Sequence, residues 1–308
     1  MKCEELCSIL PRRLTEMIEA FPLDPECLQE IRIRVKRPLL AVCDHQEYQS
    51  KECVSRAQIG EILAYLSNYS LYAYEEEIRQ GFLSLPGGHR VGISGRAVLE
   101  GGQVKTITEV SSLNIRFAHE VKGCADELLL DLREEGRLLN TLIASAPGQG
   151  KTTLLRDCIR QISDGYGGCP GLTVGVVDER SEIAGSFRGV PGNDMGMRTD
   201  VLDACPKAEG MMMLIRSMAP RVVAVDEIGS PEDMKALICA MNCGCVIFAT
   251  VHGSSMEELQ GKPVLKEMMD LGLFERYVFL DGSKQPGRIS QIFNQKRERL
   301  HRNLKQPR

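Results

Sequence analysis

The sequence predicts an α/β protein of two domains: a smaller α+β domain, then a mostly parallel sheet with helices on both faces. The chain has 308 residues, of which 43% are hydrophobic and 26% are charged. These values fit a folded chain long enough for two modest domains and exclude disordered and fibrous proteins. The second half alternates short apolar runs with helical patterns, which is typical of a parallel sheet covered on both faces.

Residues 1–135 form the predicted N-terminal domain. Apolar residues recur at helical intervals between Lys2 and Phe21, where Pro11 would divide the helix. Residues 31–35 alternate apolar side chains with arginine, as a half-buried strand does. Helical patterns follow at 56–66 and 70–81, and two strand patterns joined by a turn at 100–102 follow at 90–99 and 104–107.

Residues 136–294 form the predicted second domain, with the boundary near the charged helix at 126–136. Its candidate strands are the apolar runs at 140–145, 172–177, 222–225, 246–251 and 276–280. The last segment, residues 295–308, is a basic tail with six Lys or Arg residues and one acidic residue. A solvated terminus is favoured there over a contact with anionic lipid or nucleic acid.

Charge and targeting patterns predict a cytoplasmic protein. The 38 Lys and Arg residues against 42 Asp and Glu residues give a net charge of -4, so a nucleic-acid partner is not expected. Residues 1–10 lack the basic start of an export signal. The longest run without charge or His, residues 236–251, is too short and too polar to cross a bilayer, so we expect no membrane segment.

The twelve cysteines are scattered among apolar segments, which favours reduced, buried thiols over a disulfide scaffold. Cys239, Cys243 and Cys245 lie close together in the sequence. Their spacing does not match the paired cysteines of a zinc site, so a structural role is predicted for them.

The strongest motif is an apolar strand, a Gly-containing loop and a helix that opens with Lys-Thr. Backbone amides of such a loop bind phosphate, the lysine adds positive charge, and the threonine hydroxyl ligates Mg²⁺. The usual leading glycine is Ser145 here, which is small enough for the loop to close. The residues predicted to bind ATP are Ser145, Ala146, Pro147, Gly148, Gln149, Gly150, Lys151, Thr152 and Thr153.

A second motif supplies carboxylates, because the apolar run 222–225 leads directly into Asp226 and Glu227. This pattern predicts that Asp226 holds Mg²⁺ together with Thr152, and that Glu227 orients and deprotonates the attacking water. The strand at 172–177 ends in a further acidic sequence, Asp178 to Glu182, in which Glu179 is the alternative base. Both motifs together predict an ATPase that depends on Mg²⁺.

The run 246–251 includes Thr250 and is followed by His252, so both lie at the carboxyl end of a strand. In a parallel sheet this end would lie beside Asp226. His252 could sense the γ-phosphate there, and a simply solvated histidine is the alternative.

These four motifs together resemble the Walker A, Asp box, Walker B and His box of the ATPases that drive type II and type IV secretion. The likeness spans residues 31–294, includes Ser94–Ala97 and Leu113–Arg116, and is nearest to a sporulation branch of that superfamily. It implies a RecA-like P-loop domain in which one additional strand separates the Walker A strand from the Walker B strand. It also implies an ATPase in the mother cell of a spore former, working with channel proteins in the membrane around the forespore.

The same resemblance implies a homo-oligomeric ring, with a hexamer expected, in which an N-terminal arginine reaches the nucleotide of a neighbour. Arg90, Arg96 and Arg116 are the candidates, and ordinary solvated or salt-bridged arginines are the alternative for each. Two other classes stay open, a non-hydrolysing nucleotide-dependent scaffold and a motor that remodels nucleic acid. Glu227 speaks against the scaffold, and the near-neutral charge speaks against the nucleic-acid motor.

The segment 187–210 is rich in Gly and Asp and has little periodicity. We expect a long loop that acts near the nucleotide or the pore of the ring, with a surface insertion as the alternative.

Overall fold

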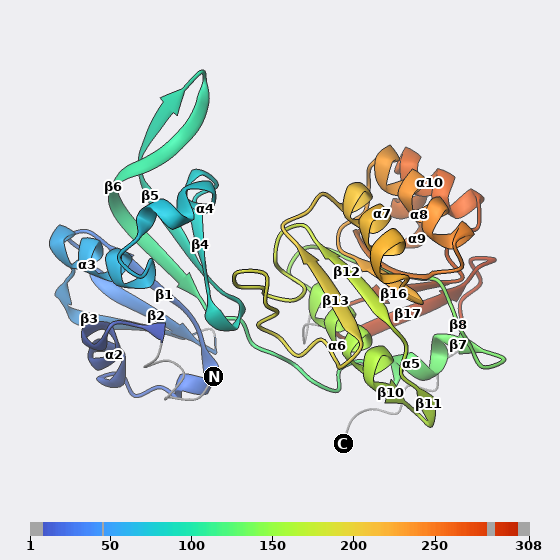
Figure 1. Cartoon of the computed structure of the whole chain (residues 1–308). Helices are drawn as coiled ribbons and strands as arrows, with labels where there is room; N and C mark the ends of the chain where they lie inside the picture. The colour runs from blue at the N-terminus through green and yellow to red at the C-terminus, as the bar shows by residue number, and fades with distance from the viewer. Residues whose placement is uncertain (1–8, 45, 282–286, 301–308) are drawn as a thin grey trace. The chain divides into compact units, whose positions relative to one another are not determined.

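The computed structural model of the chain describes residues 9–44, 46–281 and 287–300. Its internal contacts divide the chain into two compact units, coloured blue to green and green to red in Figure 1. The first unit holds the chain up to His119 together with Gly185–Gly192, and the second holds Glu120–Ala184 and the chain from Asn193 onward.

The first unit is built on a six-stranded antiparallel sheet of order β3-β2-β1-β6-β5-β4. Three helices, α2, α3 and α4, pack on one face of this sheet. Alternate strand residues on that face, such as Ile31, Val91 and Ile115, are buried in a common core. The other face carries polar residues, including the arginines of β1. The elements are α2 (Arg12–Glu19), β1 (Leu28–Arg34), β2 (Pro38–Cys43), β3 (Gln46–Cys53), α3 (Arg56–Leu66), α4 (Glu75–Arg79), β4 (Phe82–Leu85), β5 (His89–Glu100) and β6 (Gln103–Arg116).

Local sequence signals set the ends of the helices in this unit. Helix α3 begins and ends where expected, because Ser55 and Gln58 form a capping box in front of it. The helix expected at 2–21 is shorter in its described part, since α2 begins directly after Pro11 and ends at Glu19. The rest of that prediction, residues 1–8, lies outside the described residues.

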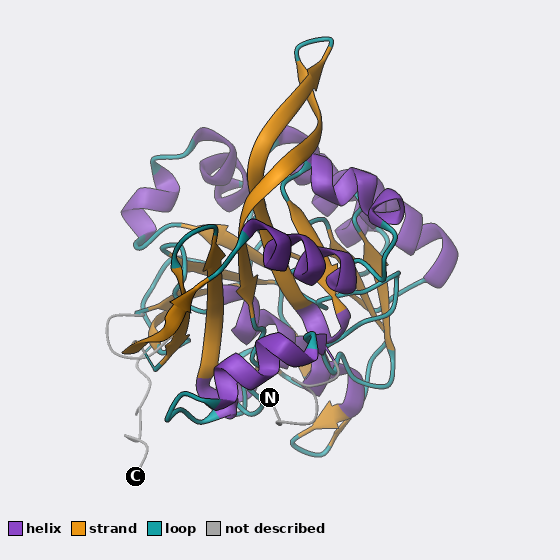
Figure 2. Ribbon diagram, turned by 90° about the vertical axis from the view of Figure 1, so that its left-hand side faces the viewer, coloured by secondary structure: helices purple, strands orange, loops and turns teal. Residues whose placement is uncertain are grey.

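Strands β5 and β6 continue past the rest of the sheet as a two-stranded ribbon, which projects from the first unit in Figures 1 and 2. Only residues 89–92 of β5 pair with β4, and only residues 112–116 of β6 pair with β1. A bulge interrupts the ribbon between Ser94 and Arg96, and a Cβ atom at Gly95 would come within 2.6 Å of the Thr108 carbonyl oxygen. The bulge therefore requires glycine at this position.

The second unit is built on a seven-stranded sheet of order β13-β12-β14-β15-β9-β16-β17, in which only β17 is antiparallel to its neighbour. Alternate strand residues face two separate cores. The strands are β9 (Thr141–Ser145), β12 (Val174–Asp178), β13 (Thr199–Asp203), β14 (Val222–Val225), β15 (Val246–His252), β16 (Arg276–Leu280) and β17 (Ile289–Asn294).

Helices cover both faces of this sheet (Figure 1). One face packs on α5 (Leu128–Asp131) and α6 (Lys151–Asp164), and the other on α7 (Lys207–Met218), α8 (Pro231–Asn242), α9 (Met256–Gln260) and α10 (Pro263–Asp270). Among the described residues, no helix is both long enough and apolar enough to cross a membrane.

Strand β15 lies between β9 and β14, so one additional strand separates the phosphate-loop strand from the acidic strand, as the resemblance implied. The prediction of a structureless loop at 187–210 is wrong. Residues 199–203 form β13 and α7 begins at Lys207. Strand β13 lies at the edge of the sheet and is only half-buried, so it lacks the continuous apolar run that revealed the other strands. Within the same segment, Phe187 packs against the core of the first unit.

The division between the units falls after His119, earlier than the predicted boundary at residue 135. Helix α5 belongs with the second unit because Leu128 and Leu129 are fully buried in the same core as Leu154 of α6. At the other end of the chain, Leu300 packs against this core, so the first residues of the predicted basic tail are attached to the second unit. The remaining tail, residues 301–308, lies outside the described residues.

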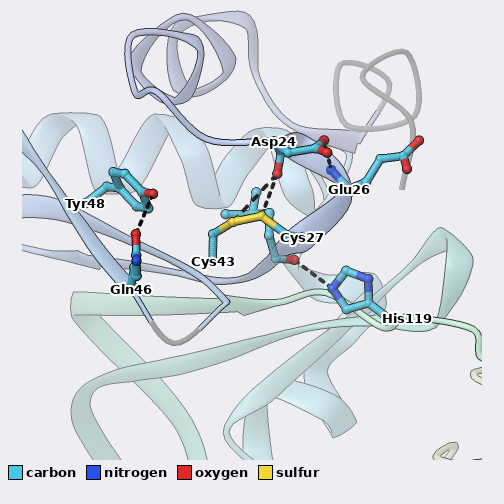
Figure 3. The surroundings of a disulfide bond; sticks show 8 residues. Asp24, Glu26, Cys27, Cys43, Gln46, Tyr48 and His119 are labelled. Atoms are coloured by element: carbon cyan, nitrogen blue, oxygen red, sulfur yellow. Dashed lines mark hydrogen bonds between the residues drawn. A yellow bond between two sulfur atoms is a disulfide. The ribbon is translucent and has the colours of Figure 1, made fainter. Parts of the chain in front are cut away.

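The prediction of reduced, buried cysteines is wrong for Cys27 and Cys43, which form a disulfide (Figure 3). Cys27 directly precedes β1, and Cys43 ends β2 opposite Leu28 in the sheet register. This register brings the two Cα atoms to 5.1 Å, within the range that a disulfide spans. Of the described free thiols, only Cys158 and Cys245 are buried, whereas Cys53 and Cys243 are exposed and the others are half-buried.

Candidate active site

The predicted phosphate loop follows β9 and leads into α6. Ser145 is the last residue of β9 and is fully buried, and its hydroxyl donates to the Ala146 carbonyl oxygen at 2.8 Å. Gly148 and Gly150 have φ angles of 73° and 89°, which glycine adopts without steric cost. Serine at the leading position therefore leaves the loop closed. The remaining residues predicted for ATP, Pro147, Gln149 and Thr153, lie in this loop or in the first turn of the helix.

Lys151 opens α6 and is only 5% exposed. Its ammonium donates to the carbonyl oxygens of Ser145 and Ala146, at 3.3 Å each, and lies 3.1 Å from Nδ1 of His252. Burial lowers the pKa of this ammonium, and the Asp226 and Glu227 carboxylates oppose that shift. The loop therefore holds the lysine folded back over its own carbonyl groups.

The two residues predicted to hold Mg²⁺ are in contact. The Thr152 hydroxyl donates to Oδ2 of Asp226 at 2.7 Å, and the Thr250 hydroxyl donates to Oδ1 of the same carboxylate. The Thr152 hydroxyl at the start of α6 and the Asp226 carboxylate directly after β14 are oxygen ligands of the kind that Mg²⁺ prefers. The residues present therefore fit this ion.

Glu227 follows with an unusual backbone. Its φ angle is 52°, and its N–H lies 3.1 Å from Oδ1 of Asp226 and 2.9 Å from Oγ1 of Thr250. A left-handed conformation at a residue other than glycine costs free energy and persists only where the surroundings hold it. The side chain is held as well, because Oε2 accepts from Arg180 at 2.9 Å and Oε1 lies 2.8 Å from Nε2 of His252.

His252 connects Lys151 to Glu227 through its two ring nitrogens. A lysine ammonium has only donors, so Nδ1 accepts, and a proton on Nε2 faces the Glu227 carboxylate. The structure thus brings together four predicted residues, Lys151, Asp226, Glu227 and His252, at the carboxyl ends of β14 and β15 and the N-terminus of α6.

The acidic sequence after β12 divides into two roles. Asp178 is 1% exposed, and its oxygens accept the N–H groups of Glu182 and Ala184 at 2.9 and 2.8 Å. Burial raises the pKa of this carboxyl group, and the backbone hydrogen bonds oppose the shift. Glu179 is exposed, pairs with Lys207, and lines a small pocket that also contains Asp226 and Glu227.

Sequence reasoning missed the basic residues that hold these carboxylates and loops. Arg156 of α6 donates to the carbonyl oxygen of Glu182 at 2.7 Å and to that of Ile183, and Arg180 holds Glu227. Arg180 stands inside the acidic motif itself, which was the available signal. Arg156 lies four residues after Thr152, on the same helix face, but nothing in the sequence indicates its partners.

The three candidate arginines lie in the first unit, whereas the other predicted site residues lie in the second. Arg96 is exposed on β5 just after the bulge, and Arg116 is exposed at the end of β6. The Arg90 guanidinium lies over the ring of Phe82, 3.8 Å from its centre.

Sequence comparisons give a consistent result. A family model described as sporulation stage III, protein AA, matches residues 1–300. Stage III sporulation protein AA of Bacillus subtilis (strain 168) is 43% identical over 291 residues, which cover 94% of each chain. The uncharacterized protein ycf45 of Porphyra purpurea is 25% identical over 307 residues, which cover 95% of this chain and 48% of that one.

Solved structures show the same fold. The Legionella pneumophila ATPase DotB has a TM-score of 0.60 at 16% identity, covering 88% of this chain and 76% of that one. The pilus retraction motor PilT, solved with ADP, has a TM-score of 0.55 at 13% identity, covering 87% and 76%. These likenesses confirm the predicted class, a RecA-like domain with a mostly parallel sheet, preceded by an α+β domain.

Proposed function

Because the chain belongs to the family of sporulation stage III protein AA, we propose that it hydrolyses ATP with Mg²⁺ and drives a secretion-type channel complex during sporulation, from mother cell to forespore. The observation that carries the proposal is the chain of contacts from Lys151 through His252 to Glu227, next to the Thr152–Asp226 pair. Within this one region, Lys151 would bind the phosphates, the Thr152–Asp226 pair would bind the metal, and Glu227 would bind the attacking water.

Residues 145–153 would hold ATP. Backbone N–H groups of the loop and of the first turn of α6 would bind an anion at the helix N-terminus, which the positive end of the helix dipole favours. Lys151 would leave the loop carbonyls and His252 for the β- and γ-phosphates, because a phosphate offers stronger, charge-assisted hydrogen bonds. Thr152 and Asp226 would hold Mg²⁺, which neutralises developing phosphate charge when bound.

Glu227 would orient the attacking water and accept its proton. Its backbone, held by Thr250 and by Asp226, keeps the carboxylate beside the phosphate loop. His252 would act on the same water or on the γ-phosphate once Lys151 has released Nδ1. Glu179, which pairs with Lys207, is the alternative base. Glu227 is favoured over it because it directly follows Asp226 in the sequence and its N–H lies 3.1 Å from Oδ1 of that residue.

A ring, expected to be a hexamer, would complete the site with an arginine from a neighbour. Arg96 and Arg116 suit this role because both are exposed and, among the described residues, neither guanidinium has an ion-pair partner. The channel proteins of the sporulation membrane complex would be the further partners, and they would bring this cytoplasmic ATPase to the membrane.

A phosphate-release assay on the purified chain tests the proposal. Wild-type protein should release phosphate from ATP only with Mg²⁺, and Lys151→Ala should abolish this activity. Lys266→Ala, which removes an exposed lysine on α10, is the matched control and should keep it. Equal turnover in the wild type and in Lys151→Ala would refute the assignment, and arms with DNA or lipid vesicles separate a nucleic-acid motor from a membrane-associated one.

A further inference from the structure

A pocket of about 300 Å³ lies on the polar face of the first unit's sheet, and the proposed ATPase reaction does not use it. We propose that this pocket binds a small organic phosphate. Its polar lining comes from Arg32 and Arg34 of β1, Ser94 of β5, and Ser112 and Asn114 of β6, and Gly92 of β5 leaves the space open.

The strand register places these residues on one face. Arg32 lies opposite Asn114 and Arg34 opposite Ser112 across β1 and β6. Across β6 and β5, Asn114 lies opposite Gly92 and Ser112 opposite Ser94. Opposite residues of an antiparallel pair share a face, so the six positions form two adjacent rows. The residues between them, such as Ile33 and Leu113, point into the core.

The lining contains two guanidinium groups and no carboxylate. Glu30 holds Nε of Arg32 at 2.5 Å, which leaves the terminal N–H groups of Arg32 for a ligand. Glu30 itself lies opposite Arg116 in the register of β1 and β6 and is not part of the lining. Within the described part of the chain, the Arg34 side chain has no ion-pair partner. Two guanidiniums match the nearly two negative charges of a phosphate monoester and bind its oxygens in pairs.

Asn114 indicates that the ligand also carries a hydrogen-bond donor. Its Nδ2 donates to Glu30 at 3.2 Å, but its buried Oδ1 has no partner in the structure. A buried acceptor is normally satisfied, and neither phosphate oxygens nor arginines already bound to a phosphate would satisfy this one. A small rotation of the Asn114 amide would let this oxygen accept from a hydroxyl or amino group next to the phosphate, which favours an organic phosphate over the inorganic ion.

Isothermal titration of the full-length chain with ribose 5-phosphate, inorganic phosphate and ribose tests the proposal. Ribose 5-phosphate should bind more tightly than inorganic phosphate, and ribose should not bind measurably. Absence of binding by ribose 5-phosphate, or equal binding by ribose, would overturn the proposal.

Variants locate the binding. A Cβ atom at Gly92 would meet Asn114 only at 3.8 Å, so Gly92→Val fits the strand while filling the pocket, and it should abolish binding. Arg34→Gln should weaken binding about 10- to 100-fold, the usual effect of losing a charged hydrogen bond. Arg37→Gln is the matched control, since Arg37 is exposed, carries the same charge and is not part of the lining. Retained binding in both Gly92→Val and Arg34→Gln would refute the site, and thermal unfolding verifies that each variant is folded.

One further variant separates this pocket from the ATP site. Lys151→Ala should bind ribose 5-phosphate as the wild type does, because Lys151 lies in the second unit. If Lys151→Ala removes the binding, the phosphate loop is the binding site and the proposal fails. The result does not depend on whether the protein hydrolyses ATP.

Discussion

The charged side chains of the two units are arranged in opposite ways. In the second unit, Lys151, His252 and Glu227 contact one another in a continuous chain. In the first unit, Arg34 and Arg116 are exposed, and no described residue pairs with either guanidinium. The site of the second unit is thus preorganised within a single chain, whereas Arg34 and Arg116 would be stabilised by a ligand or a partner brought to them.

The largest expected effect comes from a test of whether the exposed Arg96 and Arg116 act on the nucleotide of a neighbouring subunit. Arg96→Ala or Arg116→Ala should lower the turnover of ATP by about 10³ to 10⁵, as loss of an arginine supplied in trans does in other NTPases. Mixing either variant with Lys151→Ala should restore part of the activity, because some interfaces then join an intact phosphate loop to an intact arginine. Arg37→Ala serves as the exposed control. Turnover that is independent of protein concentration, with no rescue in any mixture, would favour a self-sufficient monomer.

The next largest effect is expected at the site of the second unit, where Lys151, His252 and Glu227 contact one another. Glu227→Gln keeps the shape of the side chain but removes the base, so hydrolysis should fall by about 10² to 10⁴ while binding of ATP with Mg²⁺ persists. Phosphate release and binding of a fluorescent ATP analogue measure the two properties separately. Glu179→Gln is the comparison variant, because Glu179 lines the same pocket. A trapped nucleotide in Glu179→Gln, with near-normal turnover in Glu227→Gln, would reverse the two roles.

The units should also differ in their response to reductant. The Cys27–Cys43 disulfide joins residues 16 positions apart in the first unit, so its loss in Cys43→Ser should destabilise that unit by about 3 kcal/mol. The second unit contains no disulfide among its described residues. Thermal unfolding with and without dithiothreitol should therefore shift one transition and leave the other. A shift of both transitions would show that the units unfold together.

The smallest effect concerns Asp157, which is 2% exposed on α6 and accepts from Ala125 N–H at 2.8 Å and from Arg160 at 2.7 Å. Burial opposes the charged form, but these hydrogen bonds outweigh it and hold the pKa of Asp157 below its usual value. The stabilisation is therefore complete above the pKa of the unfolded carboxyl and is lost as the pH falls through the folded value.

Asp157→Asn should accordingly lower the free energy of unfolding by about 1 to 3 kcal/mol at pH 7. The difference from wild type should shrink below a pH of about 4, where aspartate is protonated in the unfolded chain. Urea unfolding at both pH values measures it. A difference that is the same at both values would mean that Asp157 acts through shape and not through charge.

The parts of the fold that could be predicted from the sequence are those with local or periodic signals. Buried parallel strands show as apolar runs, and the capping box before α3 fixes its start. Strand β13 could not be predicted in this way, because an edge strand mixes polar and apolar residues. The pairing of Cys27 with Cys43 depends on the register of β1 and β2, which no local pattern encodes.

The candidate site divides along the same line. The sequence identifies the residues of the two motifs, because each motif consists of one apolar strand and the short segment that follows it. These residues are Lys151, Thr152, Asp226 and Glu227. The contacts that orient them, such as Arg180 on Glu227 or His252 on Lys151, join residues 47 and 101 positions apart. Those contacts depend on the order of the strands in the sheet.

The chain passes between the two units more than once, because Gly185–Gly192 leaves the second unit and is counted with the first. Removing the N-terminal residues would leave this segment behind, with Phe187 deprived of the core on which it packs. Phe187 and Val190, which is 67% exposed, would then form an exposed apolar patch next to the loop that Asp178 holds through the Ala184 N–H. A truncated second unit should therefore carry a short polar turn in place of these residues, because otherwise aggregation would dominate its measured properties.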